Sequence, residues 1–235
     1  MNRSLLFAAL FVLSGTAALP GTAAAHDPAA QGPGQDIDKV NGSITAEAAQ
    51  AYGDLSTVNG SIRIEAGAHI EEAETVNGSI RADDDIQARS LSTVNGGIHM
   101  GERAQIDGKI ETVNGGIFVD RGSKVSRGIE TVNGAIGMVD TDLGGDIETV
   151  NGDITVGVGS HVKGGIHVEK PNKGWSGFRM GKQKIPRIVI GPDAVVEGSL
   201  VFEREVKLYV HSSARIGSLR GATAVRFDGN MPPKD

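Results

Sequence analysis

Residues 58–76 read VNGSIRIEAGAHIEEAETV, and the final Val76 begins a second copy of the same pattern. An isoleucine follows each Val-Asn-Gly four places after its valine, and Thr precedes six of the seven copies. A repeat this regular predicts a fold built of stacked, equivalent coils. Val-Asn-Gly occurs seven times in the 235 residues, with spacings of 18 or 19, at Val40, Val58, Val76, Val94, Val113, Val132 and Val150.

The repeat divides into three parts. Steps of six from Val58 reach Ile64, Ile70 and Val76, so that each part opens with an apolar residue. We therefore predict an all-β fold, namely a single-stranded parallel β-helix (a triangular β-solenoid with coils of about 18 residues). The first and fifth residues of each side are expected to point inward. Helical solenoid repeats need about 33 residues or more and do not fit this period.

The Asn-Gly pair is expected at a corner of each coil, because glycine adopts positive φ freely and Asn tolerates it better than most residues. Stacking of equivalent corners would bring the asparagine amides into one column, where they can hydrogen-bond as a ladder. Turn chemistry accounts for the motif without a ligand. The expected ladder consists of Asn41, Asn59, Asn77, Asn95, Asn114, Asn133 and Asn151.

The first 25 residues have the pattern of a cleaved signal peptide. Arg3 is followed by an apolar stretch from Leu5 to Leu19 and by the small residues Thr22 to Ala25. A retained membrane anchor is the alternative, but about 20 apolar residues are needed to cross a bilayer. We expect an exported chain, in the periplasm or at the cell surface or outside the cell, that does not span the membrane after cleavage.

The rest of the chain divides by composition and repeat quality. Residues 154–168 align without gaps on residues 188–202, which extends one solenoid of nine or ten coils past the last Val-Asn-Gly. Residues 46–52 suggest a short helix in the first coil. The expected parts are a flexible linker (26–38), the Val-Asn-Gly solenoid (39–168), a basic loop insertion (169–187), degenerate C-terminal coils (188–228) and a tail (229–235).

The insertion combines basic and aromatic residues and contains no acid between Lys170 and Arg187. Such a loop can bind an acidic glycan or another acidic envelope component, whereas nucleic acid does not suit an exported chain. The alternative is a solvated loop whose aromatic rings pack on the solenoid. The candidate binding residues are Lys170, Lys173, Trp175, Phe178, Arg179, Lys182, Lys184 and Arg187.

Charge is unevenly distributed along the chain. Residues 26–168 hold 10 Lys and Arg against 22 Asp and Glu, a net charge of −12, whereas residues 169–235 hold 12 against 7, a net charge of +5. Copies of such a molecule can associate end to end, because opposite charges attract and the ends of a solenoid expose unpaired strand edges. The alternative is that the acidic faces keep the N-terminal coils soluble.

Catalytic chemistry has little support in this sequence. Glu111, Glu130 and Glu148 occupy one repeat position, with Glu74 further down, and could share a cation such as Ca²⁺ or act as an acid/base pair. Exposed carboxylates paired with Lys109 or Arg127 are the simpler interpretation. The chain lacks Cys, and its six His fall at different repeat positions. We therefore expect no catalytic residues, metal site or cofactor.

The repeated Thr-Val-Asn-Gly-x-Ile over residues 39–168 resembles the bacterial adhesin-type β-strand-repeat family of secreted or membrane-tethered proteins. Residues 188–220 resemble the repeats of bactofilins, the polymer-forming β-helix proteins of bacteria. These resemblances imply a non-enzymatic structural or adhesin-like element of the bacterial cell envelope, which can self-associate through its ends. The alternative is a carbohydrate-active β-helix enzyme or an acidic-glycan-binding protein.

Overall fold

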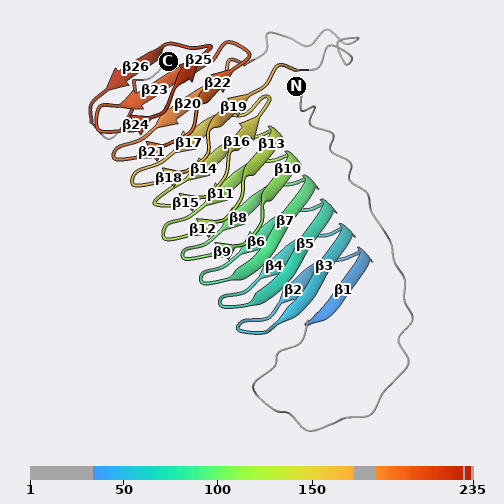
Figure 1. Ribbon diagram of the computed structural model, residues 1–235. Helices are drawn as coiled ribbons and strands as arrows, with labels where there is room; N and C mark the ends of the chain where they lie inside the picture. The colour runs from blue at the N-terminus through green and yellow to red at the C-terminus, as the bar shows by residue number, and fades with distance from the viewer. Residues whose placement is uncertain (1–33, 172–183, 230, 234–235) are drawn as a thin grey trace, which may run out of the picture. The chain divides into compact units, whose positions relative to one another are not determined.

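The computed structural model describes residues 34–171, 184–229 and 231–233. These residues form a parallel β-solenoid of ten coils without a helix, as the repeat predicts (Figure 1). No segment among them is a helix long and apolar enough to cross a bilayer. The expected signal peptide, residues 1–25, lies outside the described residues.

One side of the triangle is a ten-stranded parallel sheet, with one strand from each coil in chain order. Each strand follows the Asn-Gly corner or its equivalent. The strands are β2 (Ile44–Ala46), β4 (Ile62–Ile64), β6 (Ile80–Ala82), β8 (Ile98–Met100), β11 (Ile117–Val119), β14 (Ile136–Met138), β17 (Ile154–Val156), β20 (Arg187–Ile190), β23 (Lys207–His211) and β26 (Ala224–Phe227).

The other two sides belong to one sixteen-stranded sheet. Its early strands are long and run through both sides: β3 (Tyr52–Asn59), β5 (His69–Asn77) and β7 (Gln87–Asn95), with β1 (Gln35–Asn41) paired to β3. Later coils have two short strands in their place. The second side holds β9 (Gln105–Ile106), β12 (Lys124–Val125), β15 (Asp142–Leu143), β18 (His161–Val162), β21 (Val195–Val196) and β24 (Arg215–Ile216); the third holds β10 (Ile110–Asn114), β13 (Ile129–Asn133), β16 (Ile147–Thr149), β19 (Ile166–Val168), β22 (Leu200–Phe202) and β25 (Leu219–Arg220).

The register continues across the insertion without a shift. Ile154 pairs with Ile188, and Ile166 pairs with Leu200, so the coils on either side of residues 169–187 stack directly. The isoleucines that follow each corner form an unbroken buried column through the centre. Because one coil cannot bury its own apolar residues, the stacking of like on like supplies the core.

Two details of the corner differ from the sequence prediction. The valine of Val-Asn-Gly does not point inward: Val40 is 61% exposed, and the six valines that follow a Thr are half-buried. The preceding Thr is buried instead, as at Thr57 and Thr112. Strict alternation along Ile110-Glu-Thr-Val explains this, because only every second side chain can face the core. The hydroxyl of Thr112 donates to the carbonyl of Gly96 at 2.9 Å, which satisfies a buried polar group.

The corner glycines are required for a reason other than the positive φ expected from the sequence. Among the glycines of Val-Asn-Gly only Gly42 has positive φ, at 110°. At Gly96, a Cβ atom would lie 1.9 Å from the carbonyl oxygen of Gly78 in the preceding coil. Close approach of successive corners therefore excludes any side chain at this position.

One predicted helix and two predicted boundaries need correction. Residues 46–52 do not form a helix, because they turn from β2 to β3 and stack on equivalent residues of the next coil. The expected linker ends early, since β1 already begins at Gln35 and pairs with β3. Arg187, assigned to the loop, is the first residue of β20 and pairs with Lys207.

Candidate functional site

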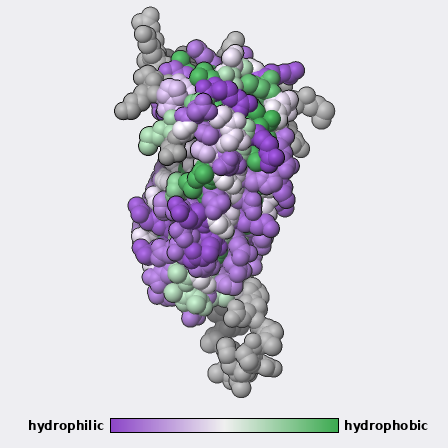
Figure 2. Space-filling model, turned by 90° about the vertical axis from the view of Figure 1, so that its left-hand side faces the viewer, coloured by the Kyte–Doolittle hydropathy of each residue, from purple (hydrophilic) through white to green (hydrophobic). Residues whose placement is uncertain are grey.

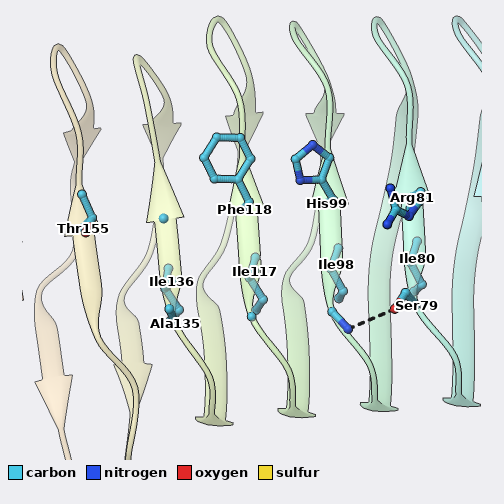
Figure 3. Close-up of a pocket in the computed structure, with 13 residues that line it drawn as sticks. Ser79, Ile80, Arg81, Ile98, His99, Ile117, Phe118, Ala135, Ile136 and Thr155 are labelled. Atoms are coloured by element: carbon cyan, nitrogen blue, oxygen red, sulfur yellow. Dashed lines mark hydrogen bonds between the residues drawn. The ribbon is translucent and has the colours of Figure 1, made fainter.

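A shallow groove of about 440 Å³ lies on the outer face of the ten-stranded sheet. Side chains alternate along these short strands, so the residue after each buried isoleucine points outward. Across β6, β8, β11, β14 and β17 these outward residues are Arg81, His99, Phe118, Gly137 and Thr155 (Figure 3). The groove thus crosses five coils along the solenoid axis.

Two aromatic rings occupy the middle of the groove. The ring centroids of His99 and Phe118 are 5.0 Å apart, and the ring planes are inclined by 13°. The two rings are therefore stacked, and Figure 3 shows a face of each toward the viewer. A Cβ atom at Gly137 would lie 3.3 Å from Cδ2 of Phe118, so the glycine leaves room for the edge of that ring. The result is a small aromatic platform on the outer face of the sheet. The face of the molecule drawn in Figure 2 is mostly hydrophilic.

Arg81 differs from its neighbours in charge pairing. Arg63, one coil earlier in the same column, contacts Asp83 at 2.8 Å and Glu65 at 3.9 Å. Asp84, at the adjacent corner, lies 3.7 Å from Arg103. Within the described ranges Arg81 makes no ion pair. It therefore leaves a cation available at one end of the groove.

The seven asparagines lie in one column and form a hydrogen-bonded ladder. From Asn59 to Asn151, each side-chain Nδ2 donates to Oδ1 of the asparagine in the preceding coil, at distances from 2.9 to 3.1 Å. At the C-terminal end of the ladder, Nη1 of Arg204 donates to Oδ1 of Asn151 at 2.6 Å. At the other end Asn41 lies on β1 with no preceding coil among the described residues. This arrangement ties the corners together along the axis.

The glutamates also share a column. Glu111, Glu130 and Glu148 are in register on β10, β13 and β16, and Ser92 separates them from Glu74. Lys109 forms an ion pair with Glu111, one of the two partners expected from the sequence. The three acids are half-buried rather than exposed.

Burial and crowding alter the protonation of this column. The pKa of Glu130 is raised to about 7, first by desolvation and then by the carboxylates of Glu111 and Glu148, while the Lys109 ammonium opposes the rise. Desolvation also raises the pKa of Glu74. Glu130 can therefore hold or release a proton near neutral pH. Among the residues that the structure describes, no group of three or more His, Asp or Glu side chains is placed to hold a metal ion.

Only part of the predicted basic loop can be described. Lys184 forms an ion pair with Asp153. The guanidinium of Arg187 lies 4.8 Å from the ring centroid of Tyr209 and donates to the carbonyl of Pro233 at 2.6 Å. These two cations are held against the solenoid, and the backbone of Lys170 lies next to Glu203. The other candidates, Lys173, Trp175, Phe178, Arg179 and Lys182, lie outside the described residues.

The groove was not predicted from the sequence, because the corner motif gives no sign of it. The signal lies in the outward-facing residues that follow each repeat isoleucine. Reading the residue after each repeat isoleucine would have shown Arg63, Arg81, His99, Phe118 and Gly137 in consecutive coils. Comparison of the chain with protein-family models, curated proteins and solved structures found no match.

Proposed function

We propose that this chain is an exported, non-catalytic structural or adhesin-like β-solenoid of the bacterial cell envelope, which self-associates end to end. The observation that carries the proposal is the position of two opposite charges. Asp38 and Arg220 are the first and last members of one column on the third side of the solenoid, which runs from β1 to β25. A second copy stacked in register would bring its Asp38 next to Arg220 of the first.

Both ends of the solenoid present unpaired strand edges. Within the described residues, β1 and β2 at one end and β24, β25 and β26 at the other have a neighbouring strand on one side only. Every strand pairing is parallel, so the last coil of one copy offers the first coil of another the same hydrogen-bonding pattern that joins coils within the chain. Such a head-to-tail contact does not close on itself and would produce filaments.

Charge at the two ends is complementary. Asp36 and Asp38 lie exposed on β1, whereas each strand of the last coil carries an arginine: Arg215 on β24, Arg220 on β25 and Arg226 on β26. None of these arginines forms an ion pair within the described part of the chain. The net charges of −12 for residues 26–168 and +5 for residues 169–235 act in the same direction.

Light scattering from the chain beginning at residue 26, with negative-stain imaging, tests this proposal. The expected result is a mass that rises with protein concentration at low salt and falls as salt screens the end charges. A monomer at every concentration and salt would overturn the self-association.

The basic loop is the proposed contact for an acidic envelope component. Deletion of residues 171–186 removes four of the six cations from Lys170 to Arg187 and retains all of β20, at the loss of the backbone hydrogen bond from Lys207 to Pro186. Binding to isolated envelope fractions should weaken in the deletion variant. Unchanged binding would remove the loop from the proposal.

A carbohydrate-active enzyme is the second candidate, favoured by the glutamate column. Glu130, with its pKa of about 7, has the protonation behaviour of a general acid or base. Incubation with polyuronates and peptidoglycan tests this function. Turnover that is abolished in Glu130→Gln would replace the structural proposal with catalysis.

A further inference from the structure

We infer that the groove on the ten-stranded sheet binds a linear saccharide chain that carries carboxylates, with its sugar rings on the His99–Phe118 platform and a carboxylate at Arg81. This inference rests on the proposed envelope function, which includes an acidic partner, and it specifies the chemical class of that partner. It concerns a different surface from the basic loop and from the ends of the solenoid.

The platform suits the apolar face of a pyranose ring. Phe118 is half-buried and shows its ring face in the close-up, with the His99 ring beside it (Figure 3). The C–H groups on one face of a sugar ring carry partial positive charge and pack on the negative face of an aromatic ring. Gly137, on the adjacent strand β14, has no side chain. A saccharide whose sugar ring packs on Phe118 can therefore extend toward Thr155 without meeting a side chain.

The length of the groove favours a chain over a single sugar. Arg81 on β6 and Gly137 on β14 are three coils apart, which at the usual strand spacing is about 14 Å. A ligand that contacts both places must run along the solenoid axis over several rings. The exposed hydroxyl of Thr155 at one end and Ser79 at the other supply polar contacts for sugar hydroxyls.

Arg81 supplies the preference for a carboxylate. Its guanidinium can donate two parallel N–H bonds to a carboxylate, the geometry in which arginine binds anions best. The two acids that follow it closely in the chain already have partners, since Asp83 contacts Arg63 and Asp84 lies near Arg103. A carboxylate of the ligand therefore meets an available cation rather than an occupied one.

Isothermal titration calorimetry of the chain beginning at residue 26, which retains every coil of the solenoid, tests the inference with defined probes. The probes are a linear hexamer of galacturonate and, as the uncharged counterpart, cellohexaose. We expect the galacturonate hexamer to bind more tightly than cellohexaose. Phe118→Ala should weaken binding of the acidic hexamer at least about tenfold, and Arg81→Gln should do the same. Arg127→Gln, which changes an exposed arginine outside the groove, is the matched control and should bind as the unmodified chain does.

Three results would overturn the inference. One is the absence of binding of the acidic hexamer at millimolar concentration. Another is equal weakening by Arg127→Gln, which would indicate only general charge attraction. The third is binding of N-acetyltryptophanamide at the platform without saccharide binding, which would assign the groove to an aromatic side chain. Self-association is measured without saccharide, so failure here and failure of end-to-end assembly are distinguishable.

Discussion

Nη1 of Arg204 lies 2.6 Å from Oδ1 of Asn151 and 2.9 Å from the backbone carbonyl of Val150. Asn151 is the last residue of the asparagine ladder, and its Oδ1 would otherwise accept from a further asparagine. Arg204 comes from a later coil, after the insertion, and occupies that position. The side chain therefore ends the ladder and joins the degenerate C-terminal coils to the regular ones.

Replacement of this terminating residue tests its structural importance. Arg204→Ala removes these two hydrogen bonds and the one that Nη2 donates to the carbonyl of Lys184 at 3.3 Å, and it should lower the free energy of unfolding by about 1–3 kcal/mol. Arg127→Ala, at an exposed arginine outside the ladder, should change it by less than about 0.5 kcal/mol. Urea unfolding followed by circular dichroism measures both. Equal effects of the two variants would show that Arg204 does not stabilise the ladder.

The ladder itself predicts a dependence on position. Asn95→Ala removes two amide hydrogen bonds, to Asn77 and from Asn114, whereas Asn41→Ala at the end removes one. At about 1 kcal/mol for each bond, the first variant should lose about 2 kcal/mol and the second about 1 kcal/mol. Thermal and urea unfolding of the two variants make the comparison. A larger loss at Asn41 would contradict the additive ladder.

Adjacent glycines at one corner should respond very differently to alanine. Gly96→Ala places a Cβ atom 1.9 Å from the carbonyl oxygen of Gly78, which must separate the coils, and should cost about 3 kcal/mol or more. Gly97→Ala is the control, because Ser79 in the preceding coil and Ala135 two coils further on already carry side chains at the equivalent place. Its Cβ atom would lie 3.1 Å from the nearest oxygen. Unfolding midpoints test the pair, and a Gly96→Ala variant as stable as Gly97→Ala would refute the close-approach explanation.

The glutamate column predicts a pH dependence of stability. The pKa of Glu130 is raised in the folded chain from its ordinary 4.5 to about 7, so the folded state binds this proton more tightly. Stability should therefore rise as pH falls from 7 toward 4.5, and the penalty should be present in full above pH 7. Glu130→Gln should be more stable than the unmodified chain at pH 8 and show a weaker dependence between pH 5 and 8.

Urea midpoints at pH 5 and pH 8 test this expectation. Glu47→Gln, at an exposed acid beyond β2, is the control. Identical pH dependence in Glu130→Gln and the unmodified chain would show that the column carries no such penalty.

The sequence predicts most of the architecture because the repeat is long, regular and apolar at fixed places. Ile62, Ile80 and Ile98 alone determine the coil length and the stacking partner. Which side chains at the corner face the core was harder to predict from the sequence. Counting in sixes places Val58 inside, but strand alternation from Leu55 places Thr57 inside, and the constancy of that Thr was the available signal.

Other features depend on contacts between coils that no single repeat reveals. Residues 46–52 are rich in good helix formers, yet stacking on the next coil overrides this local preference. The aromatic platform requires His99 and Phe118, 19 residues apart in the sequence, to be neighbours in space. Arg204 is likewise distant in sequence from Asn151, and only the continued register across the insertion brings them together.

Sedimentation velocity with charge exchange at the two ends tests the central claim, end-to-end self-association, most directly. Asp38→Arg places like charges at the contact with Arg220, and so does Arg220→Asp with Asp38; each single variant should remain monomeric at concentrations at which the unmodified chain assembles. The double variant restores opposite charges and should assemble again, while Lys163→Glu, an exposed change in mid-solenoid, should not affect assembly. Restored assembly in the double variant alone is the result that the account predicts. Assembly that is unaffected by the single exchanges, or an unmodified chain that stays monomeric, would contradict it.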